Sequence, residues 1–201
     1  MKVIGLCGGS GSGKSAVSKL FDKFNIPSID TDLVYKEITS SDTECMQALV
    51  SAFGKSVQNS DGSLNRNRMR ELVFFDSNGY DNRMRLNEIT HAFVLSETDR
   101  RIENYSREGR EAVIADVPLM FESGFDKKCD ILVAVIADDD VRTSRIMNRD
   151  DISLEQAKAR IASQIPSDEL KTRVDYVIEN NSDIGYLEKE IDNLYKKIFE
   201  K

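Results

Sequence analysis

Residues 8–15 read Gly8-Gly9-Ser10-Gly11-Ser12-Gly13-Lys14-Ser15, and this stretch decides the fold. It follows the short uncharged run Val3-Ile4-Gly5-Leu6-Cys7 and precedes apolar residues at helical spacing. The pattern G-x-x-x-x-G-K-[ST] between a strand and a helix is that of a phosphate-binding loop, or P-loop. We therefore expect a nucleoside triphosphate to bind here together with its metal ion.

The chemistry of the loop is local. Its glycines allow left-handed backbone and bring several N–H groups close to one anion. The helix that begins at Gly13 adds the positive end of its dipole. Lys14 reaches the β- and γ-phosphates and acts in catalysis, while the hydroxyl of Ser15 faces Mg²⁺. The predicted nucleotide-binding set comprises Gly11, Ser12, Gly13, Lys14, Ser15 and Ala16. The alternative, a glycine-rich turn without a ligand, is disfavoured by the flanking strand and helix.

Composition limits the class of protein. A chain of 201 residues with 40% hydrophobic residues suits one α/β domain with an insertion. No apolar run approaches the ~20 residues of a membrane span, and a strand starting at Lys2 disfavours a signal peptide. Three cysteines without C-x-x-C spacing favour a reducing compartment and no zinc site. We expect a cytoplasmic protein with no membrane partner, in which Cys7 and Cys129 are buried.

The net charge of −7 disfavours nucleic acid as a partner, because binding to a phosphate backbone requires a basic face. The anionic groups of a small substrate must then be bound by a few arginines near the site.

Five short apolar runs predict the strands of a parallel sheet buried on both faces. They are Lys2–Cys7, Pro27–Asp30, Glu111–Asp116, Ile131–Ala137 and Tyr176–Glu179. Helical patterns alternate with them, at Lys14–Phe24, at Val141–Asn148 and in a C-terminal stretch with Leu187, Ile191, Leu194 and Ile198 on one face. This alternation predicts an α/β fold with a doubly wound, five-stranded parallel sheet of the P-loop NTPase type.

Two insertions interrupt the alternation. Residues 40–108 contain helical patterns at Met46–Phe53, Asn65–Phe75 and Asn82–Tyr105, and predict a helical insertion. Residues 150–173 predict a helical lid, which begins near 142 in an alternative division, and Ser153 with Gln156 forms a capping box within it. The nucleotide-binding core then comprises residues 1–39, 109–149 and 174–201.

Acidic residues follow two of the predicted strands, at the edge where α/β sheets bind ligands. Asp32 can accept a proton from an incoming hydroxyl or bind magnesium through water; alternatively it caps a helix that begins at Leu33. Asp116 ends an apolar run in the Walker B pattern, which holds Mg²⁺ in many P-loop proteins. Glu122 is either part of the site or an ordinary surface residue.

Arg142, Arg145 and Arg149 share one helix face. Arginines near a P-loop can neutralise the charge that develops during phosphoryl transfer. A solvated helix with ion pairs is the alternative, and we expect at least one of the three to be functional. His91, the single histidine, is more often structural than functional in such a setting, and without a second ligand it makes no metal site.

Several further segments resemble the dephospho-coenzyme A kinase family, from one end of the chain to the other. They are Ile4–Ser15, Ile29-Asp30-Thr31-Asp32, Phe53-Gly54, Asp61–Arg66, Leu86–His91, Pro118-Leu119-Met120-Phe121-Glu122, Arg145–Asp150, Ala159-Arg160, Gln164 and Asp175–Asn180. Three positions depart from the family pattern, since Cys7 and Ala16 replace the usual threonines and Ala92 replaces a proline.

The resemblance implies transfer of the ATP γ-phosphate to the ribose 3′-hydroxyl of dephospho-CoA, with Mg²⁺. The helical insertion would then bind CoA. Asp32 would be the catalytic base, Arg145 and Arg149 would act in catalysis, Arg142 would cover ATP, and Asn180 would read adenine. The implied substrate contacts are Asp32, Arg66, His91, Pro118 and Leu119, and the implied metal contacts are Ser15 and Asp116.

Two other function classes stay open from the residues. One is a different small-molecule P-loop kinase, and the other is a non-enzymatic nucleotide switch. Asn180-Asn181-Ser182-Asp183 only half fits the guanine-reading motif, which disfavours the switch. We expect a monomer or a weak homo-oligomer.

Overall fold

The computed structural model of the chain describes residues 1–41, 43–118 and 120–200. It divides into two compact units. The first comprises Met1–Ile29 and Tyr105–Lys201, and the second comprises Asp30–Asn104. We call them the core unit and the helical unit, and describe each by itself.

The sheet has five strands in the order β2-β3-β1-β4-β5. The strands are β1 (Lys2–Cys7), β2 (Ser28–Asp30), β3 (Ala112–Asp116), β4 (Ile131–Ile136) and β5 (Tyr176–Glu179). β1 pairs in parallel with β3 and β4, and β4 pairs in parallel with β5. The predicted doubly wound parallel sheet is confirmed, with strand ends shifted by at most one residue from those expected. Burial of every strand on both faces is wrong for β5 at the sheet edge, where Val177 and Glu179 are exposed.

The central position of β1 follows from its composition. Every residue of β1 after Lys2 is buried, as expected for a strand with neighbours on both sides and helices on its faces. Leu6 is paired with Asp116 on β3 and with Val133 on β4. This register places the end of β3 beside the point where β1 passes into the P-loop.

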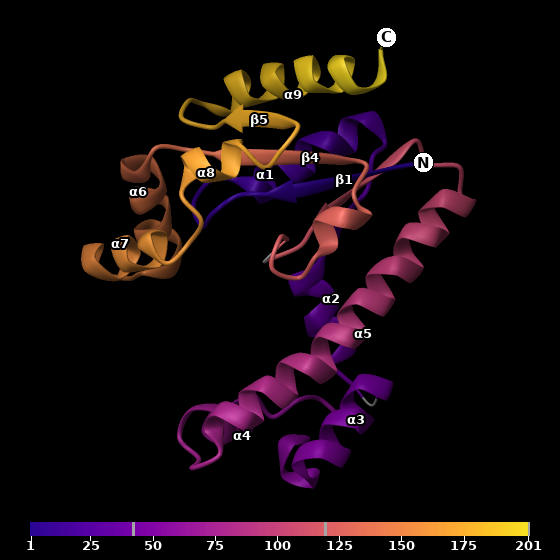
Figure 1. The fold of residues 1–201 in the computed structure, drawn as a ribbon, viewed down its shortest axis with the longest axis vertical. Helices are drawn as coiled ribbons and strands as arrows, with labels where there is room; N and C mark the ends of the chain where they lie inside the picture. Colours follow the sequence, from indigo (N-terminus) through magenta and orange to yellow (C-terminus); the bar gives the residue numbers. More distant parts are fainter. Residues whose placement is uncertain (42, 119, 201) are drawn as a thin grey trace. The chain divides into compact units, whose positions relative to one another are not determined.

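Helices α1 (Lys14–Leu20) and α9 (Ile184–Phe199) pack on one face of this sheet, as Figure 1 shows for α9 above β5. Their buried side chains meet those of the strands in one apolar cluster. It includes Val17, Leu187, Ile191, Leu194 and Ile198 from these helices, Phe21 from the turn after α1, and Ile4, Leu6, Ile114, Val133, Val135 and Ile178 from the sheet. Complete burial of a side chain such as Phe21 contributes roughly 1.5–3 kcal/mol to folding.

The first helix is shorter than predicted. α1 ends at Leu20 and passes into the 3₁₀ turn η1 (Phe21–Phe24), which ends where Asn25 takes a left-handed conformation with φ of 59°. The chain can then turn toward β2.

The other face of β1 packs closely against the segment that precedes β4. A Cβ added to Gly5 would lie 2.7 Å from the Sγ of Cys129 and 2.8 Å from a methyl carbon of Leu132, so only glycine fits at this point. Cys7 is buried as expected, whereas Cys129 is only partly buried.

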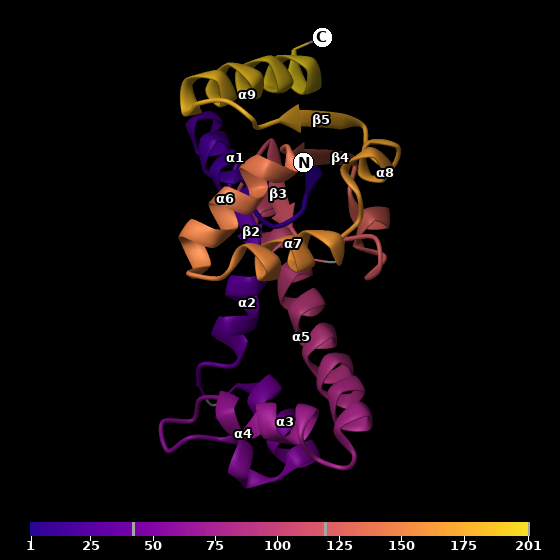
Figure 2. The ribbon, with the colours of Figure 1, turned by 90° about the vertical axis from the view of Figure 1, so that its left-hand side faces the viewer.

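The core unit also contains the 3₁₀ turn η3 (Phe125–Lys128) and the helices α6 (Asp139–Asp150), α7 (Leu154–Ala162) and α8 (Ser167–Lys171), of which the last three are labelled in Figure 2. α7 begins with the predicted capping box, in which the backbone N–H of Ser153 donates to Oε1 of Gln156 at 2.9 Å and the backbone N–H of Gln156 donates to Oγ of Ser153 at 3.3 Å. No described helix combines the length and apolar character needed to cross a membrane.

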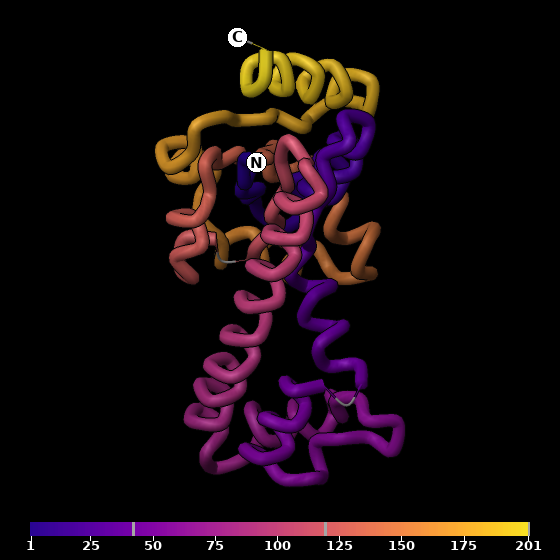
Figure 3. The backbone as a smooth tube through the Cα atoms, turned by 90° about the vertical axis from the view of Figure 1, so that its right-hand side faces the viewer, coloured from indigo at the N-terminus to yellow at the C-terminus, as the bar shows by residue number. Residues whose placement is uncertain are grey.

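The helical unit has its own apolar cluster. It contains α2 (Thr31–Ile38), α3 (Glu44–Phe53), the 3₁₀ turn η2 (Lys55–Val57), α4 (Arg66–Phe74) and most of α5 (Gly79–Arg107). The cluster is built by Cys45, Met46, Leu49, Val57, Leu64, Met69 and Val73. α2 lies beside α5 (Figure 3), and an ion pair joins Glu37 on α2 to Arg101 on α5. α5 begins three residues earlier than expected because Gly79 continues directly from a turn.

Candidate nucleotide-binding site

The backbone of the P-loop requires its glycines. Gly11 and Gly13 have φ of 77° and 97°, values that side-chain-bearing residues rarely adopt. A Cβ on Gly13 would also lie 2.1 Å from Nδ2 of Asn180. The loop is therefore held in a conformation in which successive N–H groups can surround an anion.

Lys14 and Asp116 come together at the end of β1. Nζ of Lys14 donates to the backbone oxygen of Gly8 at 3.0 Å and lies 3.8 Å from Oδ1 of Asp116. The Leu6–Asp116 register produces this proximity. The ammonium group is placed over the loop, next to a carboxylate at the Walker B position, as the motif spacing indicates.

Ser15 and Ala16 lie in the first turn of α1. Ser15 is exposed, so its hydroxyl is accessible to a ligand, whereas Ala16 packs partly against the apolar cluster. The backbone N–H groups of Ala16 and Val17 donate to the oxygen of Gly13. The side chain of Ser12 is 1% exposed, and its hydroxyl has no hydrogen-bond partner among the described residues.

Two of the three predicted arginines contact the P-loop. Nε of Arg142 donates to the backbone oxygen of Ser10 at 3.0 Å. Nη1 of Arg145 donates to the backbone oxygens of Gly11 at 3.3 Å and Asn180 at 3.0 Å. Both guanidinium groups therefore lie against the loop that is expected to hold phosphates.

Arg149, the third arginine, has no hydrogen bond to the loop among those of the described residues. It forms a bidentate ion pair with Asp150, with distances of 2.7 and 2.9 Å, and its side chain is 60% exposed. Hydrogen bonds from Arg149 and then Arg160 hold the pKa of the Asp150 carboxyl well below its usual range.

Asn180 supports the loop from β5. It is 6% exposed, and its Nδ2 donates to the backbone oxygen of Ser12 at 2.8 Å. Its backbone N–H donates to the oxygen of Ile136, which fixes the residue at the end of β5. The predicted reading of adenine by Asn180 stays a prediction, since its amide nitrogen is engaged with Ser12.

A cavity of about 200 Å³ opens beside the loop. Its lining includes Gly8, Gly9, Lys14, Pro118, Glu122 and Gln164. Pro118, a substrate contact implied by the family resemblance, therefore lines a cavity next to the loop. Glu122, which the sequence indicates as either a site residue or an ordinary surface residue, lines the same cavity. Leu119, also predicted, lies outside the described residues.

Cys7 also lines this cavity but is not a nucleophile. Burial raises the pKa of its thiol to about 12, against the smaller opposing effect of Lys14. A thiol in this state is protonated at neutral pH and unreactive.

The helical unit carries the other predicted substrate residues. Asp32 is exposed in the first turn of α2 but does not cap it, so that alternative is wrong. Asp30 is the cap, because its Oδ1 accepts from the backbone N–H groups of Asp32 at 2.8 Å and Leu33 at 3.2 Å. The carboxylate of Asp32 is thereby left out of the capping bonds.

Arg66 and His91 are both exposed in this unit. The guanidinium of Arg66 lies 5.7 Å from the ring centroid of Tyr35, a contact that the sequence pattern did not indicate. Burial raises the pKa of the Tyr35 hydroxyl, with the charge of Arg66 opposing it. The exposure of His91 does not fit a place in the apolar cluster.

Sequence reasoning missed the contacts made by Gln164. Its residue type carries no local signal, and its partner on the loop is 154 positions away in the chain. Its place in the family resemblance was the one available signal.

Comparisons with known proteins agree on one family. The dephospho-CoA kinase family model matches residues 2–185. A curated dephospho-CoA kinase from Bacillus cereus is 37% identical over 194 residues, which cover 96% of each chain. The crystal structure of TT1252 from Thermus thermophilus has a TM-score of 0.78 at 27% identity and covers 98% of this chain and 97% of its own.

A dephospho-CoA kinase from Campylobacter jejuni shares the fold, with a TM-score of 0.67 at 21% identity, covering 98% of this chain and 97% of that one. The match of the family model over most of the chain and the level of identity to the curated relative decide the classification. The chain belongs to the dephospho-CoA kinase family.

Proposed function

We propose that the protein transfers the γ-phosphate of ATP to the ribose 3′-hydroxyl of dephospho-CoA and so completes coenzyme A synthesis. Family membership supports the reaction. The observation that carries it in the structure is the approach of Lys14 to Gly8 and Asp116, 3.0 and 3.8 Å away, at the end of β1. In P-loop NTPases a lysine at this place cradles the phosphates, so this position of Lys14 supports the proposal.

In this proposal the P-loop holds the ATP phosphates. Residues Gly11 to Ala16 would surround them with the backbone N–H groups that the loop leaves unbonded, and Lys14 reaches the β- and γ-phosphates. Arg145, already held against the loop by Gly11 and Asn180, would neutralise charge on the transferred group. Arg142 orients the loop from the same helix, and Arg149 could reach the phosphate only after leaving Asp150.

The residues present fit a magnesium ion. Mg²⁺ prefers oxygen ligands and usually shares them between a few protein groups, water and substrate phosphates. The accessible hydroxyl of Ser15 and the carboxylate of Asp116 are donors of this kind on the core unit. When bound, the ion would offset negative charge on the phosphates; Ser15 and Asp116 would hold and orient it.

Asp32 is proposed as the base that orients the acceptor hydroxyl and takes its proton. Its exposed carboxylate is left out of the helix cap, which Asp30 supplies. Arg66, His91, Pro118 and Leu119 are the proposed acceptor contacts. The insertion 40–108 would bind the acceptor, and residues 150–173 would act as a lid over the nucleotide.

Three broader properties are also proposed. The net charge of −7 supports a protein without a nucleic-acid partner. Buried thiols at Cys7 and Cys45, neither in a disulfide, support a reducing compartment such as the cytoplasm. The protein would act as a monomer or a weak homo-oligomer.

A coupled assay tests the reaction. Purified protein, ATP and Mg²⁺ are mixed with dephospho-CoA, a nucleoside or a nucleoside monophosphate, and ADP release is followed. ADP should be released only when dephospho-CoA is the acceptor, and coenzyme A should form with it. Phosphorylation of a nucleotide but not of dephospho-CoA would indicate another small-molecule kinase. Tight nucleotide binding with slow hydrolysis and no acceptor would indicate a switch.

A further inference from the structure

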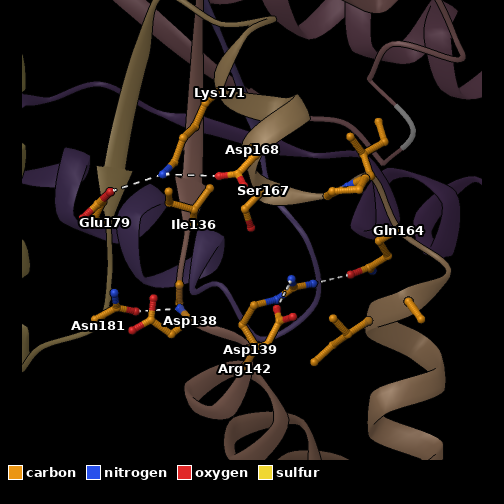
Figure 4. A pocket seen from close by; sticks show the side chains of 15 residues that line it. Ile136, Asp138, Asp139, Arg142, Gln164, Ser167, Asp168, Lys171, Glu179 and Asn181 are labelled. Atoms are coloured by element: carbon orange, nitrogen blue, oxygen red, sulfur yellow. Dashed lines mark hydrogen bonds and ion pairs between the residues drawn. The ribbon is translucent and has the colours of Figure 1, made fainter.

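Gln164 joins the segment between α7 and α8 to the P-loop. Its Oε1 accepts from the backbone N–H of Ser10 at 3.0 Å, and its Nε2 donates to Oγ of Ser10 at 3.1 Å. One side-chain amide therefore makes two hydrogen bonds to one loop residue. The lining of a neighbouring cavity of about 420 Å³ includes Gln164, with its amide directed at Arg142 (Figure 4).

The same amide oxygen also holds Arg142. Nη2 of Arg142 donates to Oε1 of Gln164 at 2.7 Å, while Nε donates to the backbone oxygen of Ser10 and Nη1 pairs with Asp139, both at 3.0 Å. Arg142 is only 4% exposed, so its charge depends on these partners. Ser10, Gln164 and Arg142 form a closed ring of hydrogen bonds, which we call the amide clip.

The clip uses both ends of the amide. The oxygen faces two N–H donors, and the nitrogen faces a hydroxyl, which can accept; the reverse orientation would set N–H against N–H. Asparagine, one methylene shorter, would not span the distance. Glutamate could keep the clip if the Ser10 hydroxyl turned to donate, but it would add a negative charge beside a loop that binds phosphates.

Gly9 leaves room for the clip. A Cβ at this position would lie 2.3 Å from Nη2 of Arg142 and 2.6 Å from Oε1 of Gln164. Unlike Gly11 and Gly13, Gly9 has no left-handed backbone that would require glycine. The absence of a side chain here is explained by the space that the clip occupies.

We propose that Gln164 is a positioning residue that fastens residues 150–173 to the P-loop and holds Arg142 against Ser10. The proposal rests on the proposed role of that segment as a lid. In consequence, the orientation of the Ser10 backbone and of Arg142 depends on where the lid segment lies. Nucleotide binding and lid position are thus coupled through one uncharged side chain. The competing interpretation is that Gln164 only completes the turn between two helices.

Hydrogen exchange on the protein alone tests the fastening. Gln164→Met keeps the length of the side chain and removes its hydrogen bonds. Exchange of amides in residues 150–173 should then become faster by ~10-fold or more, since a bond to a buried charged group is lost. Gln164→Glu should stay near the wild-type rate.

Ser163→Ala is the matched control. It removes the bond from the Ser163 hydroxyl to the oxygen of Arg160 in the same turn and leaves the clip untouched. Its exchange should match that of wild type. Unchanged exchange in Gln164→Met, or equal acceleration in Ser163→Ala, would overturn the proposal in favour of a local turn role.

Kinetics supply the second readout. Gln164→Met and Gly9→Ala, which displaces the clip from the loop side, should each lower kcat/KM for ATP by at least ~10-fold. KM for dephospho-CoA should not change, and Gln164→Glu should mainly raise KM for ATP. Equal losses toward both substrates would contradict a positioning role. Hydrogen exchange is measured without substrate, so its result tests the role of Gln164 even if the protein proves not to catalyse the proposed reaction.

Discussion

Asn180→Ala should destabilise the protein, because it removes a hydrogen bond between β5 and the P-loop. The amide of Asn180 is buried and donates to the backbone oxygen of Ser12 at 2.8 Å. Its loss leaves a buried carbonyl without that donor, which costs roughly 1–3 kcal/mol. Truncation also removes the group that occupies the space beside Gly13, where a Cβ would be 2.1 Å from Nδ2. We expect destabilisation of about 2 kcal/mol in all.

For a chain of this length, about 2 kcal/mol lowers the melting temperature by ~4–8 °C. The measurement is thermal unfolding followed by circular dichroism, with ATP titrations by calorimetry. Asn181→Ala is the matched control: its Oδ1 accepts from the backbone N–H of Asp138 at 2.7 Å, but in an exposed position. The control should lose well under half as much stability.

Asn180→Asp sharpens the test. The substitution keeps the size but sets a carboxylate oxygen against the carbonyl of Ser12, with added negative charge beside bound phosphates. The substitution should lower the binding affinities for ATP and for GTP by similar factors. Equal stability of Asn180→Ala and Asn181→Ala would refute the support role. A loss confined to discrimination between ATP and GTP would instead indicate that Asn180 reads the base.

Three further predictions use other features of the fold. Ser12→Ala should leave the melting temperature within about 2 °C of wild type or raise it, since the buried hydroxyl has no partner in the described part of the chain; a drop larger than that of Asn180→Ala would contradict this. Hydrogen bonds from Arg100, and then Arg101, hold the pKa of Glu97 at about 2. That stabilisation is present above pH ~4.5 and is lost as pH falls toward ~2. Glu97→Gln should therefore lower the free energy of unfolding in urea by about 1 kcal/mol at pH 7 and leave it unchanged near pH 2. A difference between wild type and variant that does not change with pH would exclude the linkage. Thiol reagents at pH 8 should react at least ~10-fold more slowly with the native protein than in urea, because burial raises the pKa of Cys7 to about 12 and of Cys45 to about 11; equal rates would show that these thiols are accessible.

The strands and the P-loop could be predicted because their signals are local. Apolar runs of four to seven residues mark the strands, although burial on both faces does not extend to β5, and glycine spacing marks the loop. Asp116 ends its predicted strand and Leu6 lies one residue before the predicted end of the first strand, so both were expected near one edge of the sheet; the strand order that pairs them comes from the structure. The capping box at Ser153 is likewise a signal within four residues.

The supporting contacts of the site could not be predicted in the same way. Arg142 meets Ser10 across 132 positions, and Asn180 meets Ser12 across 168. Helical spacing grouped Arg149 with Arg142 and Arg145, but a neighbouring aspartate captures it. Asp32 was considered as a cap because α2 was expected to begin at Leu33; the helix begins two residues earlier, which propensity alone does not fix, and Asp30 caps it.

The central claim is that this protein phosphorylates dephospho-CoA with Asp32 as the base. The most direct measurement is the rate of coenzyme A formation from ATP and dephospho-CoA by wild type and Asp32→Asn, with ATP affinity measured in parallel. The account predicts coenzyme A from wild type and a kcat at least ~100-fold lower in the variant, with ATP affinity nearly unchanged. Full turnover in Asp32→Asn, or no coenzyme A from wild type, would contradict it.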